Sequence, residues 1–153
     1  EGLQRSTDGG NIWTQVMPSV SVNPVTPADI EIAADGELWV GTRNNLFGFG
    51  GGRVYSSTNG TTWTLDHTHS SSNRVELACA PTDADYVYAI FESSDVVSAI
   101  KRTTNDGTNW ASLSEPNDDD TNIPSTDFSN GQASYNLIIQ VDSNDKDVAI
   151  AGG

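Results

Sequence analysis

The stretch RSTDGGNIWTQV, residues 5–16, decides the fold because it returns twice along the chain. SSTNGTTWTLD at 56–66 and RTTNDGTNWASL at 102–113 repeat its order: Ser or Thr, any residue, Asp or Asn, a glycine-bearing position and then Trp. The three tryptophans follow one another at intervals of 50 and 47 residues, and the second copy of the motif is one residue shorter. A motif that recurs at this spacing predicts a repeat architecture.

The segments between the copies also repeat. DIEIAADGELWVGT (29–42), RVELACAPTDADYVYAIF (74–91) and YNLIIQVDSNDKDVAIAGG (135–153) each read as an apolar-rich strand, a turn and a second strand. A third strand, GGRVYSS or VSAIKRT, then leads into the motif, and a fourth strand begins at its Trp. Four antiparallel strands in about 48 residues are typical of a propeller blade. The predicted fold class is therefore all-β, a segment of a β-propeller with the motif in the hairpin between the third and fourth strands.

The residue types of the motif fit the needs of a tight hairpin. An Asp or Asn side chain accepts hydrogen bonds from turn N–H groups, and glycine adopts the positive φ that other residues resist. The Ser or Thr hydroxyl ties the same turn, and the Trp ring buries it against the blade. Because none of this needs a substrate, we expect a structural role for the motif residues: Ser6, Asp8, Gly10, Trp13, Ser57, Asn59, Gly60, Trp63, Thr103, Asn105, Gly107 and Trp110.

The pattern Ser/Thr-x-Asp-x-Gly-x-Thr-Trp resembles the Asp-box of the bacterial neuraminidase repeat, a family of propellers that includes sialidases, xyloglucan-active glycoside hydrolases and sortilin-like receptors. Asp8, Gly10 and Trp13 match the Asp-box closely, whereas Asn59 and Asn105 stand in place of its Asp. The resemblance covers essentially the whole chain as a repeat. It implies a propeller fold and an extracellular or cell-surface, bacterial setting, but it does not by itself imply one activity.

The repeat predicts one propeller segment over residues 1–153. Its parts are expected at 1–17 (second half of a blade), 29–66 and 74–113 (blades), 114–134 (a long inter-blade loop) and 135–153 (first half of a blade). Propellers usually have about four to eight blades. We therefore expect this segment to be completed by the remaining blades of a longer parent chain, which we favour, or by another copy of itself.

Composition excludes some classes of partner. Lys and Arg number 7 against 21 Asp and Glu, which gives a formal net charge of −14 and a field that repels phosphate backbones and anionic membranes. No apolar run approaches the roughly 20 residues that cross a bilayer. We expect neither nucleic acid binding nor direct membrane insertion. The single cysteine, Cys79, lies in a strand-like run and is interpreted as a small buried hydrophobe.

Two acidic loops are weak candidates for calcium, since this cation prefers clustered carboxylate oxygens. The first is the loop 114–134, and the second is DSNDKD at 142–147, which we interpret first as a hairpin turn. The spacing matches no EF-hand loop, so a solvated acidic surface is favoured and no cofactor is expected. The candidate ligands are Asp118, Asp119, Asp120, Asp142 and Asp145.

Two further stretches contain residues that bind ligands in other proteins. His67 and His69, with Asp66, could hold a transition metal, but no further ligands stand at a suitable spacing and a polar connector is favoured. Phe47 and Phe49, in a glycine-rich connection, could form an exposed binding surface, although packing on a neighbouring blade is the favoured interpretation.

No catalytic constellation is evident. The resemblance to sialidases implies an arginine triad, but none of the five arginines stands in a recognisable triad context. Xyloglucan-active relatives use two carboxylates across a cleft, and such a pair has no local sequence signature. We therefore name no catalytic residue. The favoured hypothesis is a non-catalytic, secreted or cell-surface scaffold that binds protein or glycan. The alternatives are part of a glycoside hydrolase propeller and a purely structural spacer of a large adhesin or secretion-associated protein.

Overall fold

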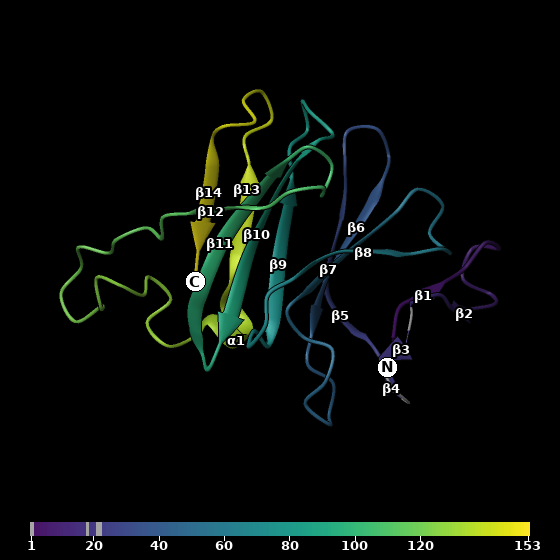
Figure 1. Cartoon of the computed structure of the whole chain (residues 1–153), viewed down its shortest axis with the longest axis horizontal. Coiled ribbons are helices and arrows are strands. Elements are labelled where there is room, and N and C mark those ends of the chain that lie inside the picture. The colour runs from purple at the N-terminus through teal and green to yellow at the C-terminus, as the bar shows by residue number, and fades with distance from the viewer. Residues whose placement is uncertain (1, 18, 21–22) are drawn as a thin grey trace.

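The computed structural model describes residues 2–17, 19–20 and 23–153. It confirms the all-β fold class, since the described residues contain strands and one short helix, α1 (Ala133–Asn136) (Figure 1). The strands are β1 (Gln4–Arg5), β2 (Thr14–Gln15), β3 (Ser19–Val20), β4 (Asn23–Pro24), β5 (Thr26–Ile32), β6 (Leu38–Arg43), β7 (Arg53–Ser57), β8 (Thr64–Thr68), β9 (Arg74–Cys79), β10 (Tyr86–Ser93), β11 (Val96–Thr104), β12 (Ala111–Leu113), β13 (Ile138–Val141) and β14 (Ala149–Gly152).

Two four-stranded antiparallel meanders form the body of the molecule. In the first, β5 pairs with β6, β6 with β7 and β7 with β8; in the second, β9 to β12 pair in the same sequential order. The two meanders join through one bridging pair, Arg43 opposite Arg74. The short hairpins β1–β2, β3–β4 and β13–β14 are separate from this sheet. Short sequential connections of this kind are typical of propeller blades.

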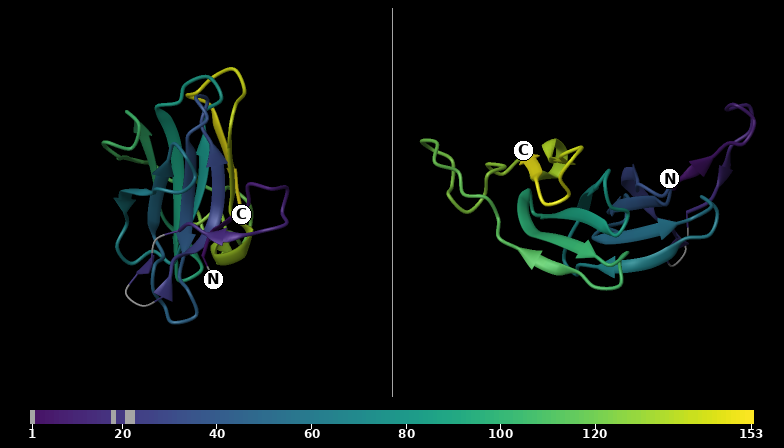
Figure 2. Two further views of the ribbon diagram at one scale, coloured as in Figure 1. Left: turned by 90° about the vertical axis from the view of Figure 1, so that its right-hand side faces the viewer. Right: turned by 90° about the horizontal axis from the view of Figure 1, so that it is seen from above.

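The first strands of the two meanders and of the last hairpin lie side by side. Strand β9 contacts both β5 and β13, so it stands between them. Figure 2 shows the sheet as a curved layer with the β13–β14 hairpin and α1 against one side of it. Functional groups on these first strands are thereby brought onto a common surface.

Successive side chains of a strand point to opposite faces of the sheet, so a meander can pack on both of its faces. One face of β9 and β10 packs on Trp39 and Val54 of the first meander. The opposite face packs on Leu137, Ile139 and Val141 near the C-terminus. The far face of the first meander covers Met17 and residues near the N-terminus. The core therefore lies between one meander and the next, and between the second meander and the C-terminal hairpin.

The C-terminal hairpin begins later than the sequence predicts. The first strand was expected from residue 135, but β13 starts at Ile138 because residues 133–136 form one helical turn. This turn buries Ala133 and Leu137 against β10 and β11, which supplies the reason for the helix. No helix in the part of the chain that the structure describes is long and apolar enough to span a membrane.

Candidate functional site

The third copy of the motif forms a self-contained turn. The hydroxyl of Thr103 donates to Asn105 Oδ1 at 3.1 Å and accepts from the backbone N–H of Gly107 at 3.0 Å. Asn105 Oδ1 also accepts from Asn109 N at 2.9 Å, and Trp110 Nε1 donates to Gly107 O at 3.1 Å. Each polar group of the motif is thus used inside the turn.

The first copy makes the same bonds, in a more exposed setting. Ser6 Oγ donates to Asp8 Oδ1 at 2.8 Å and accepts from Gly10 N at 2.9 Å. Asp8 Oδ1 accepts from Ile12 N at 3.0 Å, and these hydrogen bonds lower the pKa of the Asp8 carboxyl. Trp13 Nε1 donates to Gly10 O at 2.9 Å.

The second copy differs where its sequence is one residue shorter. Ser57 Oγ still accepts from Gly60 N at 2.9 Å, and Asn59 Oδ1 accepts from Thr62 N at 2.9 Å. Among the described residues, however, nothing accepts a hydrogen bond from the buried Nε1 of Trp63. The shortened turn keeps the hydroxyl and amide bonds and loses the indole bond.

Three of the five calcium candidates accept hydrogen bonds inside their own turns. Asp142 Oδ1 accepts from the N–H groups of Asn144 and Asp145 at 2.8 and 3.2 Å, and Asp145 Oδ1 accepts from Asp147 N at 3.0 Å. In the acidic loop, Asp118 Oδ1 accepts from Asp120 N at 2.7 Å, and Asp119 is exposed. Across residues 2–17, 19–20 and 23–153, no three His, Cys, Asp or Glu side chains are grouped as a metal site would need.

The histidines lie among aromatic rings. His67 meets Phe91 edge to face and lies tilted against Trp110, with ring centroids 5.7 and 5.4 Å away, and His69 lies 5.0 Å from Phe91. Burial, followed by the charge of Lys101, lowers the pKa of both imidazoles. His67 belongs to strand β8, so this stretch is part of a blade rather than only a connector.

Cys79 is buried at 5% exposure in the cluster between the meanders, as expected, and burial is the main cause that raises the pKa of its thiol. Phe47 and Phe49 differ from the favoured interpretation, because they are 66% and 52% exposed instead of packed on a blade. The reason is Asn45: its Oδ1 accepts from the N–H groups of Phe47 and Phe49 at 2.9 and 3.1 Å. The loop is closed on its polar side, and both rings are left in solvent.

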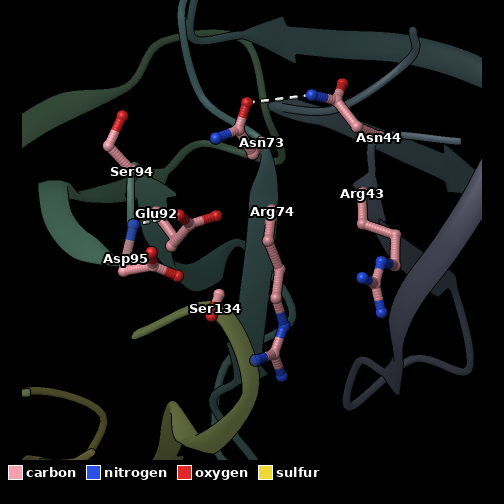
Figure 3. A pocket seen from close by; sticks show the side chains of 8 residues that line it. All are labelled: Arg43, Asn44, Asn73, Arg74, Glu92, Ser94, Asp95 and Ser134. Carbon is pink, nitrogen blue, oxygen red and sulfur yellow. Dashed lines mark hydrogen bonds between the residues drawn. The ribbon is translucent and has the colours of Figure 1, made fainter. Parts of the chain in front are cut away.

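A polar hollow lies where the two meanders meet. Arg43 ends β6 and Arg74 begins β9, opposite each other in the sheet. Above them, Asn44 Nδ2 donates to Asn73 Oδ1 at 2.8 Å and links the two connections. Figure 3 shows both guanidinium groups on the same side of the strands, pointing away from this amide pair, with the Ser134 side chain close to Arg74.

Two adjoining cavities share these arginines. One, of about 370 Å³, is lined by Arg43, Arg74, Ser134 and Tyr135 with Pro27 and Ala28. The other, of about 190 Å³, adds carboxylates from the β10–β11 turn. The buried Glu92 Oε1 there accepts from Asp95 N at 2.8 Å, which holds the turn. Both cavities are therefore lined by the two arginines, but only the smaller one is also lined by carboxylates.

Carboxylates follow further along the first strands. Asp29 and Glu31 of β5 and Glu76 of β9 line a third cavity of about 350 Å³ with Ile138 and Ile150. Burial, followed by the charge of Asp29, raises the pKa of Glu76 to about 7, although Arg74 lies against it at 2.6 Å and acts in the other direction. A carboxyl with this pKa can hold or release a proton at neutral pH.

No pattern in the sequence pointed to this site. Arg43 and Arg74 were considered only among the five arginines, none of which stands in a recognisable triad context, and Asp29, Glu31 and Glu76 had no distinguishing pattern. Their one local signal is a charged residue at the boundary of, or inside, an otherwise apolar strand. Their proximity depends on the pairing of two different meanders, which no short motif encodes.

The comparisons with known proteins support the fold. Neither a protein family model nor a curated protein matches the chain. Among solved structures, the chain is similar to the GH74 enzyme of Niastella koreensis, a β-propeller enzyme, with a TM-score of 0.55 and 22% sequence identity over 71% of this chain. It spans 17% of the length of that enzyme. At this identity the similarity shows the fold, a propeller-like segment.

Proposed function

We propose that this chain supplies blades to an extracellular β-propeller that binds a glycan on the face formed by Arg43, Arg74 and the loops beside them. The observation that carries the proposal is the presence of exposed aromatic rings and hydrogen-bonding side chains at the junction of the two meanders and in the loop that follows Arg43. Phe47 and Phe49 follow Arg43 in the chain, and Tyr135, 69% exposed, lines the same hollow as the arginines.

This combination suits a sugar. The C–H groups of a pyranose form an apolar surface that packs on an aromatic ring, while its hydroxyls need donors and acceptors around them. The donors are Arg43 and the hydroxyls of Ser134 and Tyr135. The acceptors are Asp95 and the side-chain oxygens of Asn44 and Asn73. The similarity in fold to a GH74 enzyme supports the proposal without assigning a substrate.

The test is glycan binding by the full-length protein, measured on a glycan array and then by affinity electrophoresis. The double variant Phe47→Ala/Phe49→Ala should weaken binding about tenfold or more, because two ring contacts are lost. Leu65→Ala is the matched control, since Leu65 is also exposed, at 50%, but lies on β8. Full-length protein that binds no glycan at all would contradict the proposal and favour a structural spacer.

A second function, glycoside hydrolysis, is favoured by one observation: the pKa of Glu76 is raised to about 7 in a cavity with two other carboxylates. A glycosidase needs a carboxylic acid that is still protonated near neutral pH and a second carboxylate across the scissile bond. Release of reducing sugar from soluble glucans, lost in Glu76→Gln but retained in Asp119→Asn, would establish hydrolysis. If binding is present and hydrolysis absent, the non-catalytic function holds.

A further inference from the structure

We propose that the hollow between Arg43 and Arg74 binds the carboxylate of a uronic acid, so that the glycan recognised by this face is acidic. The inference rests on the proposed function and adds the chemical class of the ligand. Its starting point is an unusual placement of charge. The chain has 7 basic and 21 acidic side chains, yet two of its arginines stand directly opposite each other at the one bridge between the meanders.

Two like charges at directly opposite positions of neighbouring strands repel each other. An acidic partner for each arginine would remove this cost, and the chain has many carboxylates to offer. Arg74 has such a partner in Glu76 at 2.6 Å, and its Nη1 lies 3.5 Å from Ala133 O. Within the described residues, the Arg43 guanidinium forms no ion pair and no hydrogen bond, and it is exposed.

Of the two guanidinium groups in the hollow, that of Arg74 is held by Glu76 and Ala133 O, and that of Arg43 is free to bind a ligand. Arg74 is held in place, with 14% of its side chain exposed, while all five N–H donors of Arg43 are available. A guanidinium matches a carboxylate through two parallel hydrogen bonds, which are stronger than bonds between neutral groups. A carboxylate here would also give Arg43 the acidic partner that Arg74 already has in Glu76.

The surroundings favour a carboxylate on a sugar over a phosphate. Glu92 and Asp95 lie in the adjoining cavity, and their negative charge would oppose a dianion more than a monoanion. The hydroxyls of Ser134 and Tyr135 suit the ring hydroxyls that flank the carboxylate of a uronic acid. The volume of about 370 Å³ lies within the range of about 300–1,000 Å³ typical of small-molecule pockets.

The experiment compares oligogalacturonate with the same oligomer after reduction of its carboxyl groups, by isothermal titration calorimetry on the full-length protein. We expect oligogalacturonate to bind about tenfold tighter than the reduced oligomer. Arg43→Gln should abolish this preference. Arg53→Gln is the control, because it makes the same change in net charge at the start of β7, outside both cavities.

Four results would overturn the inference. Equal affinity for the charged and reduced oligomers would show that the face binds glycan without a carboxylate site. The proposed function would then hold, and the inference would not. An acid preference that Arg53→Gln reduces as much as Arg43→Gln would reflect only long-range charge. Polyglutamate that binds as tightly as oligogalacturonate, with the same dependence on Arg43, would assign the site to acidic peptides. Failure to bind any glycan on the array would contradict the proposed function as well.

Discussion

The indole of Trp110 meets that of Trp39 edge to face, with ring centroids 6.3 Å apart and planes at 71°. Trp39 lies in β6 and is completely buried, whereas Trp110 follows the turn of the second meander. The repeated Trp of the motif therefore closes its own turn through the bond to Gly107 and also packs on the core of the neighbouring meander. In this way Trp110 fastens the second meander to the first.

Trp110→Ala should lower the free energy of unfolding by about 3 kcal/mol or more, because a large aromatic contact is replaced by a cavity beside Trp39. Trp13→Ala is the comparison, since Trp13 is 60% exposed and should cost much less. Urea denaturation followed by circular dichroism measures both. Equal losses for the two variants would contradict a role for Trp110 in joining the meanders.

Gly107 and Gly9 allow the conformational and steric demands of the turn to be separated. Both have a positive φ, at 75° and 74°. A Cβ at Gly107 would lie 2.9 Å from the ring of Trp39, whereas a Cβ at Gly9 would meet nothing within 4 Å. Gly9→Ala should therefore cost about 1 kcal/mol from backbone strain alone. Gly107→Ala should cost at least 1 kcal/mol more, because of overpacking; thermal denaturation of the pair tests the difference.

The hydroxyl of Thr103 should contribute more to the free energy of unfolding than the hydroxyl of Ser6, its counterpart in the first copy. Thr103 is completely buried and accepts from Gly107 N, so Thr103→Val keeps the shape of the side chain but leaves a buried N–H without a partner. We expect a loss of about 1–3 kcal/mol. Ser6→Ala removes the same bond at an exposed turn, where water replaces it, and should cost less. Amide hydrogen exchange at Gly107 gives an independent check, since its protection should fall in Thr103→Val only.

The fold was predictable because the three copies of the motif report the same local geometry. A hydroxyl, an Asp or Asn, a glycine and a Trp at fixed spacing have one common explanation, a hairpin that satisfies its own backbone. The period between Trp13, Trp63 and Trp110 then gives the length of a unit, and the strand-like segments between the copies give its four strands. The helical turn at 133–136 could not be predicted. It forms because Ala133 and Leu137 are buried against β10 and β11, which lie far away in the sequence.

The candidate site was not predictable for a similar reason. Arg43 and Arg74 are 31 residues apart, and they become neighbours only through the pairing of β6 with β9. The exposure of Phe47 and Phe49 depends on how Asn45 closes their loop, a side-chain choice that no periodicity reports. Residues inside one turn could be assigned from their spacing. Residues that meet across two meanders could not.

Two carboxyls with a raised pKa make the stability of this protein depend on pH. Burial, followed by a hydrogen bond with Asp106 and the charges of Asp106 and neighbouring carboxylates, raises the pKa of Glu37 from its ordinary 4.5 to about 7. The folded protein therefore binds a proton that the unfolded chain has already released between these two values. The stability associated with that proton is fully present below about pH 4.5 and is lost as pH rises through about 7. Glu76, whose pKa is raised to about 7 as well, acts in the same direction.

Glu37→Gln should accordingly reduce the fall in the free energy of unfolding between pH 4.5 and 7, and it should make the protein more stable than the wild type above pH 7. Part of the slope should remain, because Glu76 still titrates. Asp119→Asn is the control for net charge, since Asp119 is exposed in the acidic loop. Thermal denaturation from pH 4 to pH 8 provides the measurement. A Glu37→Gln profile that runs parallel to that of the wild type would show that this carboxyl has the same proton affinity in the folded and unfolded chains.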